Sequence, residues 1–236
     1  MARKLIFLAL SIIVASCAAE PPRRGFWLAD FLAIKELPYD SPPQVIYRID
    51  DHRFVTLEHY RDCNHGDTYY NDTVAGIRTY LARGTVENYQ GRVINADPTG
   101  KNLVVPGAEV PEYVCGDRGC NPVMMYSTDS GRTFYEKNYV NNSFNPFKYS
   151  KDFIIAATKD AVYVTEKLGE TISQTTTRKY LINPGSIYLE RDKLPDGAPF
   201  VHSPPAPTGL RTPSGQDRYT CDASIKPTNP DAPLVK

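Results

Sequence analysis

Cysteine and histidine are the residues of this chain whose spacing most directly suggests a chemical role. His59, Cys63 and His65 lie close together around an expected turn, which raises the question of a zinc site. Zinc needs a fourth ligand and a free thiolate, and this spacing matches no ligand pattern that we can defend. In an oxidising compartment, disulfide formation competes for Cys63. We therefore predict no metal and no cofactor.

The remaining cysteines predict disulfides. With Cys17 set apart, Cys63, Cys115, Cys120 and Cys221 form an even set, which in an exported chain favours two bridges. Four cysteines permit three connectivities. Because two glycines in Cys115-Gly-Asp-Arg-Gly-Cys120 let the ends of that run approach, we pair Cys115 with Cys120 and Cys63 with Cys221. Sequence alone leaves the connectivity open.

The first residues have the organisation of an export signal. Arg3 and Lys4 precede an apolar run of eleven residues, 5–15, which is short for a membrane span of about 20 residues. The run ends at Val14-Ala15-Ser16-Cys17, which resembles the lipobox of bacterial lipoproteins. The resemblance implies acylation of Cys17, a stable membrane anchor and, since Ala18 follows, sorting to the outer membrane with the folded part in the periplasm. An unanchored secreted protein is the alternative.

No arrangement of catalytic residues is recognisable. The Gly-x-Ser-x-Gly elbow of hydrolases is missing, and nothing in the sequence brings Asp50-Asp51, or Asp117 with Asp129, together as a carboxylate pair. The 27 basic and 27 acidic residues balance, so no broad field favours nucleic acid. We predict a binding protein that catalyses no reaction, does not bind nucleic acid, and meets the membrane only through its lipid.

Short runs of β-branched and aromatic residues dominate the middle of the chain and predict a mainly β fold. Polar, glycine-bearing turns between them favour an antiparallel meander, shaped as a sandwich or a small propeller-like object. One short helix is expected within residues 26–34, and a proline-rich extended arm after residue 191. The expected strands are Val45–Ile49, Arg53–Leu57, Thr68–Tyr70, Ile77–Leu81, Asn102–Val105, Val123–Tyr126, Thr133–Tyr139, Phe153–Ala157, Ala161–Thr165 and Thr175–Ile182.

These patterns divide the chain into four parts. Residues 1–16 are the predicted signal peptide and 17–43 a lipidated linker with the short helix. Residues 44–190 form the β domain, and 191–236 form the proline-rich tail. The tail is excluded from a sheet interior because proline lacks the N–H that a β-ladder needs.

One turn carries a recognisable motif. Residues 127–134 resemble the Asp box, whose pattern is Ser, any residue, Asp, any, Gly, any, Thr, aromatic. Asp129 can accept bonds from nearby amides, Gly131 can take a positive φ, and Phe134 can anchor the turn in the core. Such a box predicts a β-hairpin and no particular chemistry. Its residues here are Ser127, Asp129, Gly131, Thr133 and Phe134.

Three segments together resemble a known family. These are Pro42–Phe54, Tyr113–Cys120 and the box that ends at Phe134. They resemble the immunity lipoproteins of type VI secretion systems that protect against antibacterial phospholipase effectors, the Tli family, over about residues 42–182. The resemblance implies a noncatalytic protein that binds a phospholipase toxin in the periplasm.

Tyrosine and arginine dominate the energetics of many interfaces, and this chain has 16 tyrosines. The candidate partner contacts are Tyr69, Tyr70, Asp117 and Arg118. Two other hypotheses remain open: an envelope lipoprotein that binds glycan or other envelope proteins through the Asp-box domain, and a small periplasmic hydrolase.

Overall fold

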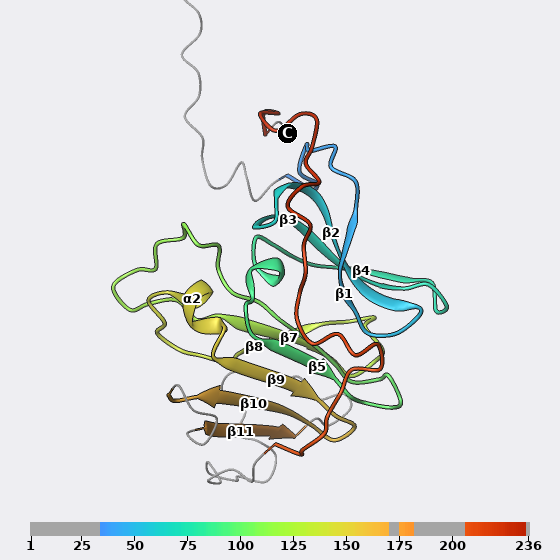
Figure 1. Cartoon of the computed structure of the whole chain (residues 1–236), viewed down its shortest axis with the longest axis vertical. Helices are drawn as coiled ribbons and strands as arrows, with labels where there is room; N and C mark the ends of the chain where they lie inside the picture. Colours follow the sequence, from blue (N-terminus) through green and yellow to red (C-terminus); the bar gives the residue numbers. More distant parts are fainter. Residues whose placement is uncertain (1–33, 170–174, 182–205, 235–236) are drawn as a thin grey trace, which may run out of the picture.

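The computed structural model describes residues 34–169, 175–181 and 206–234. Within them the chain forms three small β-sheets with one short helix and one 3-10 turn (Figure 1). The prediction of a mainly β fold is confirmed. In these ranges the sheets close neither into a barrel nor into a propeller. The helix expected near the N-terminus lies almost entirely outside the described residues.

Sheet A contains the first four strands in chain order, paired as an antiparallel meander. Its strands are β1 (Gln44–Arg48), β2 (Arg53–Asp62), β3 (His65–Asp72) and β4 (Ile77–Arg83). Aspartates stabilise its turns. The Asp50 carboxylate accepts the backbone N–H groups of His52 and Arg53, and Asp72 accepts those of Val74 and Ala75. Side-chain oxygens thus satisfy the turn amides, which fixes where each strand ends.

Sheet B has the strand order β11-β10-β9-β5. Its strands are β5 (Arg92–Asn95), β9 (Phe153–Ala157), β10 (Ala161–Lys167) and β11 (Thr175–Leu181). The last three pair antiparallel, as predicted, but β5 pairs parallel to β9. That pairing, and β5 itself, depart from the simple meander that the sequence patterns favour.

Sheet C connects the other two sheets. It contains β6 (Leu103–Pro106), β7 (Val123–Ser127) and β8 (Tyr135–Asn138), all antiparallel. The short 3-10 turn η1 (Val86–Asn88) precedes β5, and helix α2 (Pro146–Ser150) follows β8. The side chain of Asn145 caps α2 by accepting the Lys148 N–H at 3.0 Å.

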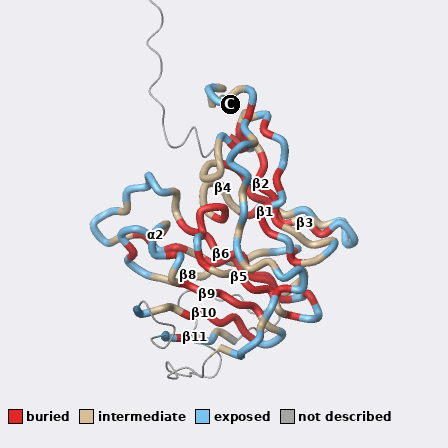
Figure 2. Tube along the Cα trace, viewed as in Figure 1, coloured by how far each residue is buried: buried red, intermediate tan, exposed pale blue. Residues whose placement is uncertain are grey.

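One hydrophobic core lies where the three sheets meet, and Figure 2 shows the buried residues gathered there. Aromatic rings make up much of it. Tyr139 packs edge-on against Tyr89 and Phe153, with ring centroids 5.9 and 5.2 Å apart. The hydroxyl groups of these buried rings need hydrogen-bond partners inside the protein. The Tyr139 hydroxyl, for example, donates to the carbonyl of Gly107 at 2.9 Å.

Residues 206–234, the C-terminal arm, form no strand or helix but contact all three sheets. In Figure 1 the arm, in red, follows β1. The N–H of Thr220 donates to Ile46 of β1 at 2.8 Å, and Asp217 accepts the N–H of Val93 of β5 at 2.9 Å. The Tyr219 hydroxyl donates to Pro106 of β6 at 3.1 Å. The arm therefore packs against the sheets as part of the folded domain.

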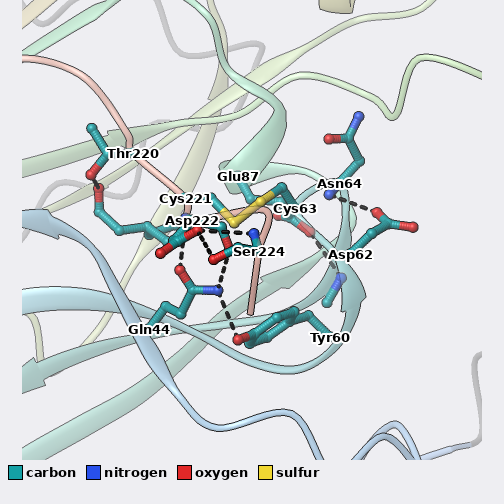
Figure 3. The surroundings of a disulfide bond; sticks show 12 residues. Gln44, Tyr60, Asp62, Cys63, Asn64, Glu87, Thr220, Cys221, Asp222 and Ser224 are labelled. Carbon is teal, nitrogen blue, oxygen red and sulfur yellow. Dashed lines mark hydrogen bonds between the residues drawn. A yellow bond between two sulfur atoms is a disulfide. The ribbon is translucent and has the colours of Figure 1, made fainter. Parts of the chain in front are cut away.

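A disulfide fixes this arm to sheet A. Cys221 is bonded to Cys63 in the turn between β2 and β3, with 5.8 Å between the Cα atoms. Figure 3 shows Gln44 of β1 beside the bridge, where its side chain accepts the Asp222 N–H at 2.8 Å and donates to the Tyr60 hydroxyl at 2.7 Å. This is the pairing preferred from the sequence, and it leaves Cys63 no thiolate for a metal.

Glu87 is a buried carboxyl next to this disulfide (Figure 3). Its oxygens accept the backbone N–H groups of Gly66 at 3.2 Å and Thr85 at 3.0 Å. Burial outweighs these bonds and raises the pKa of Glu87 to about 8. At neutral pH the folded protein therefore holds this carboxyl protonated.

A pH dependence of stability follows. In the unfolded chain a glutamate ionises near pH ~4.3, so between there and pH 8 folding takes up a proton. Stability from Glu87 is thus greatest below the unfolded pKa and falls as pH rises, by up to about 1.4 kcal/mol per pH unit. Urea unfolding at pH 5 and pH 8 should show this fall in the wild type and a smaller one in Glu87→Gln. Equal falls in both proteins would contradict it.

Candidate functional site

The segment between β6 and β7 carries a disulfide-closed loop, residues Pro111–Cys120, called here the disulfide loop. Cys115 and Cys120 are bonded, with 5.2 Å between their Cα atoms. Inside the ring, Gly119 has φ +77° and its N–H donates to the carbonyl of Gly116 at 2.8 Å. Only glycine adopts that conformation at little cost, so the sequence Cys-Gly-Asp-Arg-Gly-Cys suits the closed turn.

Two sets of contacts attach the disulfide loop to the body. Cys120 and Ser143 exchange both backbone hydrogen bonds, at 2.8 and 2.9 Å. Gly119 approaches Asn142 so closely that a Cβ atom at position 119 would lie 2.5 Å from the carbonyl carbon of Asn142. The loop is therefore joined to the segment that leads into α2, and Figure 1 shows both on the same side of the molecule.

The second attachment runs through the side chain of His65. His65, at the start of β3, lies 2.6 Å from an Asp62 carboxylate oxygen and 3.5 Å from one of Glu112 in the disulfide loop. Asp62 also caps its turn by accepting the Asn64 N–H at 2.9 Å. One histidine thus bridges the β2–β3 turn, next to Cys63, and the loop. Because Glu112 is exposed, this contact orients the loop more than it stabilises the fold.

The surface that results presents both charged and apolar side chains. Asp117 and Arg118 are exposed between the two cysteines. Just before Cys115, Tyr113 is 59% and Val114 87% exposed. Tyr113 and Val114 were not among the contact residues predicted from the sequence, because an apolar pair before a cysteine is not in itself unusual. A short apolar pair in a loop too small to bury it was the available signal.

The two tyrosine candidates on β3 lie elsewhere. Tyr70 is completely buried and packs edge-on against Phe134, with ring centroids 5.6 Å apart. Tyr69 is 7% exposed and lies beneath the Arg78 guanidinium, 3.7 Å from its ring centroid. Neither ring is available to a partner in this conformation, because both faces of β3 are covered. Of the four candidate contacts, only Asp117 and Arg118 are accessible.

The 127–134 turn is structural in its geometry. The Asp129 carboxylate accepts the N–H and hydroxyl of Thr133 at 2.9 and 2.7 Å and the Ser127 hydroxyl at 2.8 Å. Partial burial opposes ionisation, but these bonds together lower the pKa of Asp129 below its usual value. Gly131 has φ +84° and rests on the ring of Tyr70, so the turn joins sheet C to sheet A.

The described residues contain no arrangement suited to catalysis. No three His, Cys, Asp or Glu side chains are grouped there so that they could hold a metal ion. His52 contacts Asp72 at 3.0 Å, but that carboxylate caps the β3–β4 turn. A pocket of about 330 Å³ lies between sheet B and the arm. Among the described residues its lining has no carboxylate, histidine or cysteine, and therefore no acid–base pair.

Among the described residues, no helix has the length and apolar character needed to cross a bilayer. The two disulfides indicate an oxidising compartment outside the cytoplasm.

Comparison with known proteins agrees with this picture of a binding scaffold. The family model described as "T6SS Tli3 immunity protein", where T6SS is the type VI secretion system, matches residues 39–166. The match runs from before β1 almost to the end of β10 and includes the whole disulfide loop. A search of curated proteins finds no match. Immunity proteins act by binding a cognate effector and are not catalytic. Since the match spans more than half of the chain, this protein belongs to the Tli3 family of type VI secretion system immunity proteins.

Proposed function

We propose that this immunity protein binds an antibacterial phospholipase effector in the periplasm and neutralises it by occlusion. The observation that carries the proposal is the family match over residues 39–166, which includes the disulfide loop. The phospholipase specificity rests on the resemblance of Pro42–Phe54, Tyr113–Cys120 and the 127–134 turn to immunity proteins of that kind.

The sequence and the disulfides support this location. The leader, residues 1–16, directs export, and acylation of Cys17 anchors the chain, by analogy to the outer membrane. Residues 17–43 then link the lipid to the β domain. A phospholipase in the periplasm attacks the membrane from that side, so the anchor concentrates the binder at the surface under attack.

Occlusion requires a rigid surface and no catalytic group. The disulfide loop meets that need because a covalent bond, a β-bridge and the contact between His65 and Glu112 hold it before any partner arrives. Preorganisation lowers the entropy lost on binding. The effector is blocked when its substrate entrance is covered or its lid is held shut.

Arg118 is expected to contribute to this contact. Replacing it by alanine should weaken effector binding about tenfold or more, since arginines at interface centres are often energetically dominant. Arg211, exposed on the C-terminal arm, is the matched control, and its alanine variant should bind as the wild type does. Isothermal titration or surface plasmon resonance measures both. Equal affinity of the Arg118 variant and the wild type would remove this residue from the interface.

Protection of cells tests the function and its location together. A strain that directs the cognate phospholipase effector to its own periplasm should survive when it also makes the full chain. The same strain should lyse when the chain lacks residues 1–16 and stays in the cytoplasm. Lysis in both cases would contradict immunity, and survival in both would contradict a periplasmic site of action.

A further inference from the structure

Exposed apolar side chains gather around the disulfide loop. Eight large apolar residues are exposed in the described part of the chain, and four of them lie in two segments joined by the Cys120–Ser143 bridge. These four are Tyr113 (59%), Val114 (87%), Phe144 (67%) and Tyr149 (52%). The other four, Val45, Val74, Tyr80 and Leu168, lie on sheet A and after β10.

Folding does not explain the exposure of Tyr113, Val114 and Phe144. A side chain that is mostly solvated adds little to core stability, and a polar residue would serve each position in the fold equally well. The backbone that carries them is nevertheless held firmly, by the Cys115–Cys120 bond and by the paired Cys120 and Ser143. Apolar side chains displayed on a rigid frame are typical of interaction sites.

We propose that Tyr113, Val114 and Phe144 form an apolar knob, and that the effector surface it covers is the apolar rim of the acyl-chain entrance. This assignment rests on the proposed function and adds the contact chemistry to it. A phospholipase must admit a hydrocarbon chain from a membrane, so the mouth of its active site is apolar and open to its surface. A rigid apolar knob complements such a rim and excludes the substrate from it.

A lipid surface is the other apolar partner available to an anchored protein, and the charges disfavour it. Glu112 directly precedes Tyr113, and Asp117 follows two residues after Cys115, against a single basic residue, Arg118, in the loop. Anionic headgroups attract lysine and arginine and repel carboxylates. These three residues give the loop a net charge of −1, and the exposed Lys148 beside Tyr149 brings the two segments together to zero. The surface therefore lacks the cluster of basic residues that binds an anionic bilayer and suits a protein partner better.

The test compares two valines of similar exposure. Val114→Asp changes the knob, and Val74→Asp changes the β3–β4 turn, where the valine is 79% exposed. Since both side chains are solvated, both variants should fold, which circular dichroism and thermal unfolding check. With the purified full-length protein and the effector, we expect Val114→Asp to weaken binding about thirtyfold or more and Val74→Asp to leave it within about threefold.

Two further measurements separate the possible outcomes. A short-chain ether phospholipid, which occupies the acyl site without being hydrolysed, should compete with wild-type binding. If the wild type binds and inhibits the effector but Val114→Asp does so equally well, the knob is overturned while the proposed function stands. If the wild type does not bind the effector, the proposed function itself fails. Loss of binding to anionic vesicles by Val114→Asp, with effector binding unchanged, would assign the knob to the membrane and overturn the proposal.

Discussion

Replacing Cys63 and Cys221 together by serine is expected to lower the free energy of unfolding by roughly 4–5 kcal/mol. The two residues are 158 positions apart, and a bridge that closes so long a loop restricts the unfolded chain strongly in the chain-entropy model. The folded state depends on the bridge as well, because the arm that it holds contacts β1, β5 and β6.

The second disulfide provides the matched control. Cys115 and Cys120 are only five positions apart, so their double serine variant should lose roughly 2 kcal/mol in the same model. Guanidinium unfolding measures both losses, and limited proteolysis shows where the chain opens. We expect new cleavage within residues 206–234 for the first variant alone. Equal losses, or an arm that stays protected without Cys221, would contradict a structural role for this tether.

Gly131→Ala is expected to destabilise the protein by roughly 3 kcal/mol or more. Gly131 has φ +84°, where an L side chain costs about 1–2 kcal/mol. A Cβ atom there would also lie 2.1 Å from the Tyr70 ring, which is buried and cannot move without repacking sheet A against sheet C. Overpacking of this kind adds about 1–3 kcal/mol.

Two other glycines separate the two causes. Gly76 has φ +64° with open space around its Cβ position, so Gly76→Ala should cost only the backbone strain, about 1 kcal/mol. Gly116 has open space and no such φ, and its alanine variant should be nearly neutral. Thermal unfolding of the three variants should rank them in that order. A Gly131 variant no less stable than the Gly76 variant would show that the contact with Tyr70 is unimportant.

The strands of sheets A and C were predictable because their signals are local. β-branched and aromatic runs bounded by aspartate and glycine turns specify antiparallel hairpins between neighbours in the chain. The Asp50 turn and the 127–134 turn are of this kind, and the structure shows their side chains bonding to the backbone of the same turn. The disulfide loop was visible for the same reason.

What the sequence did not reveal depends on long-range packing. β5 has only four residues, and its parallel partner β9 lies about sixty residues later, so no turn between them marks the pairing. Tyr69 and Tyr70 are adjacent on β3 and point to opposite faces, so the one solvated face that an antiparallel sheet often has would expose only one of them. Here Arg78 covers one face of β3 and Phe134 packs on the other.

The candidate site likewise contains residues that local sequence could indicate and one that it could not. Asp117 and Arg118 could be singled out because they lie between paired cysteines. Phe144 could not, because its segment meets the loop through long-range contacts such as the bridge between Cys120 and Ser143, which are 23 positions apart. Whether a lone apolar side chain such as Phe144 is exposed depends on the whole fold, and no local pattern indicates it.

Inhibition of the effector is tested most directly by titrating the purified full-length protein into the cognate phospholipase effector while fatty-acid release from phospholipid vesicles is followed. We expect release to fall to background as a stable complex forms, with the two proteins eluting together from a sizing column. Unchanged hydrolysis in the presence of excess protein, with the two proteins eluting apart, would contradict neutralisation by binding.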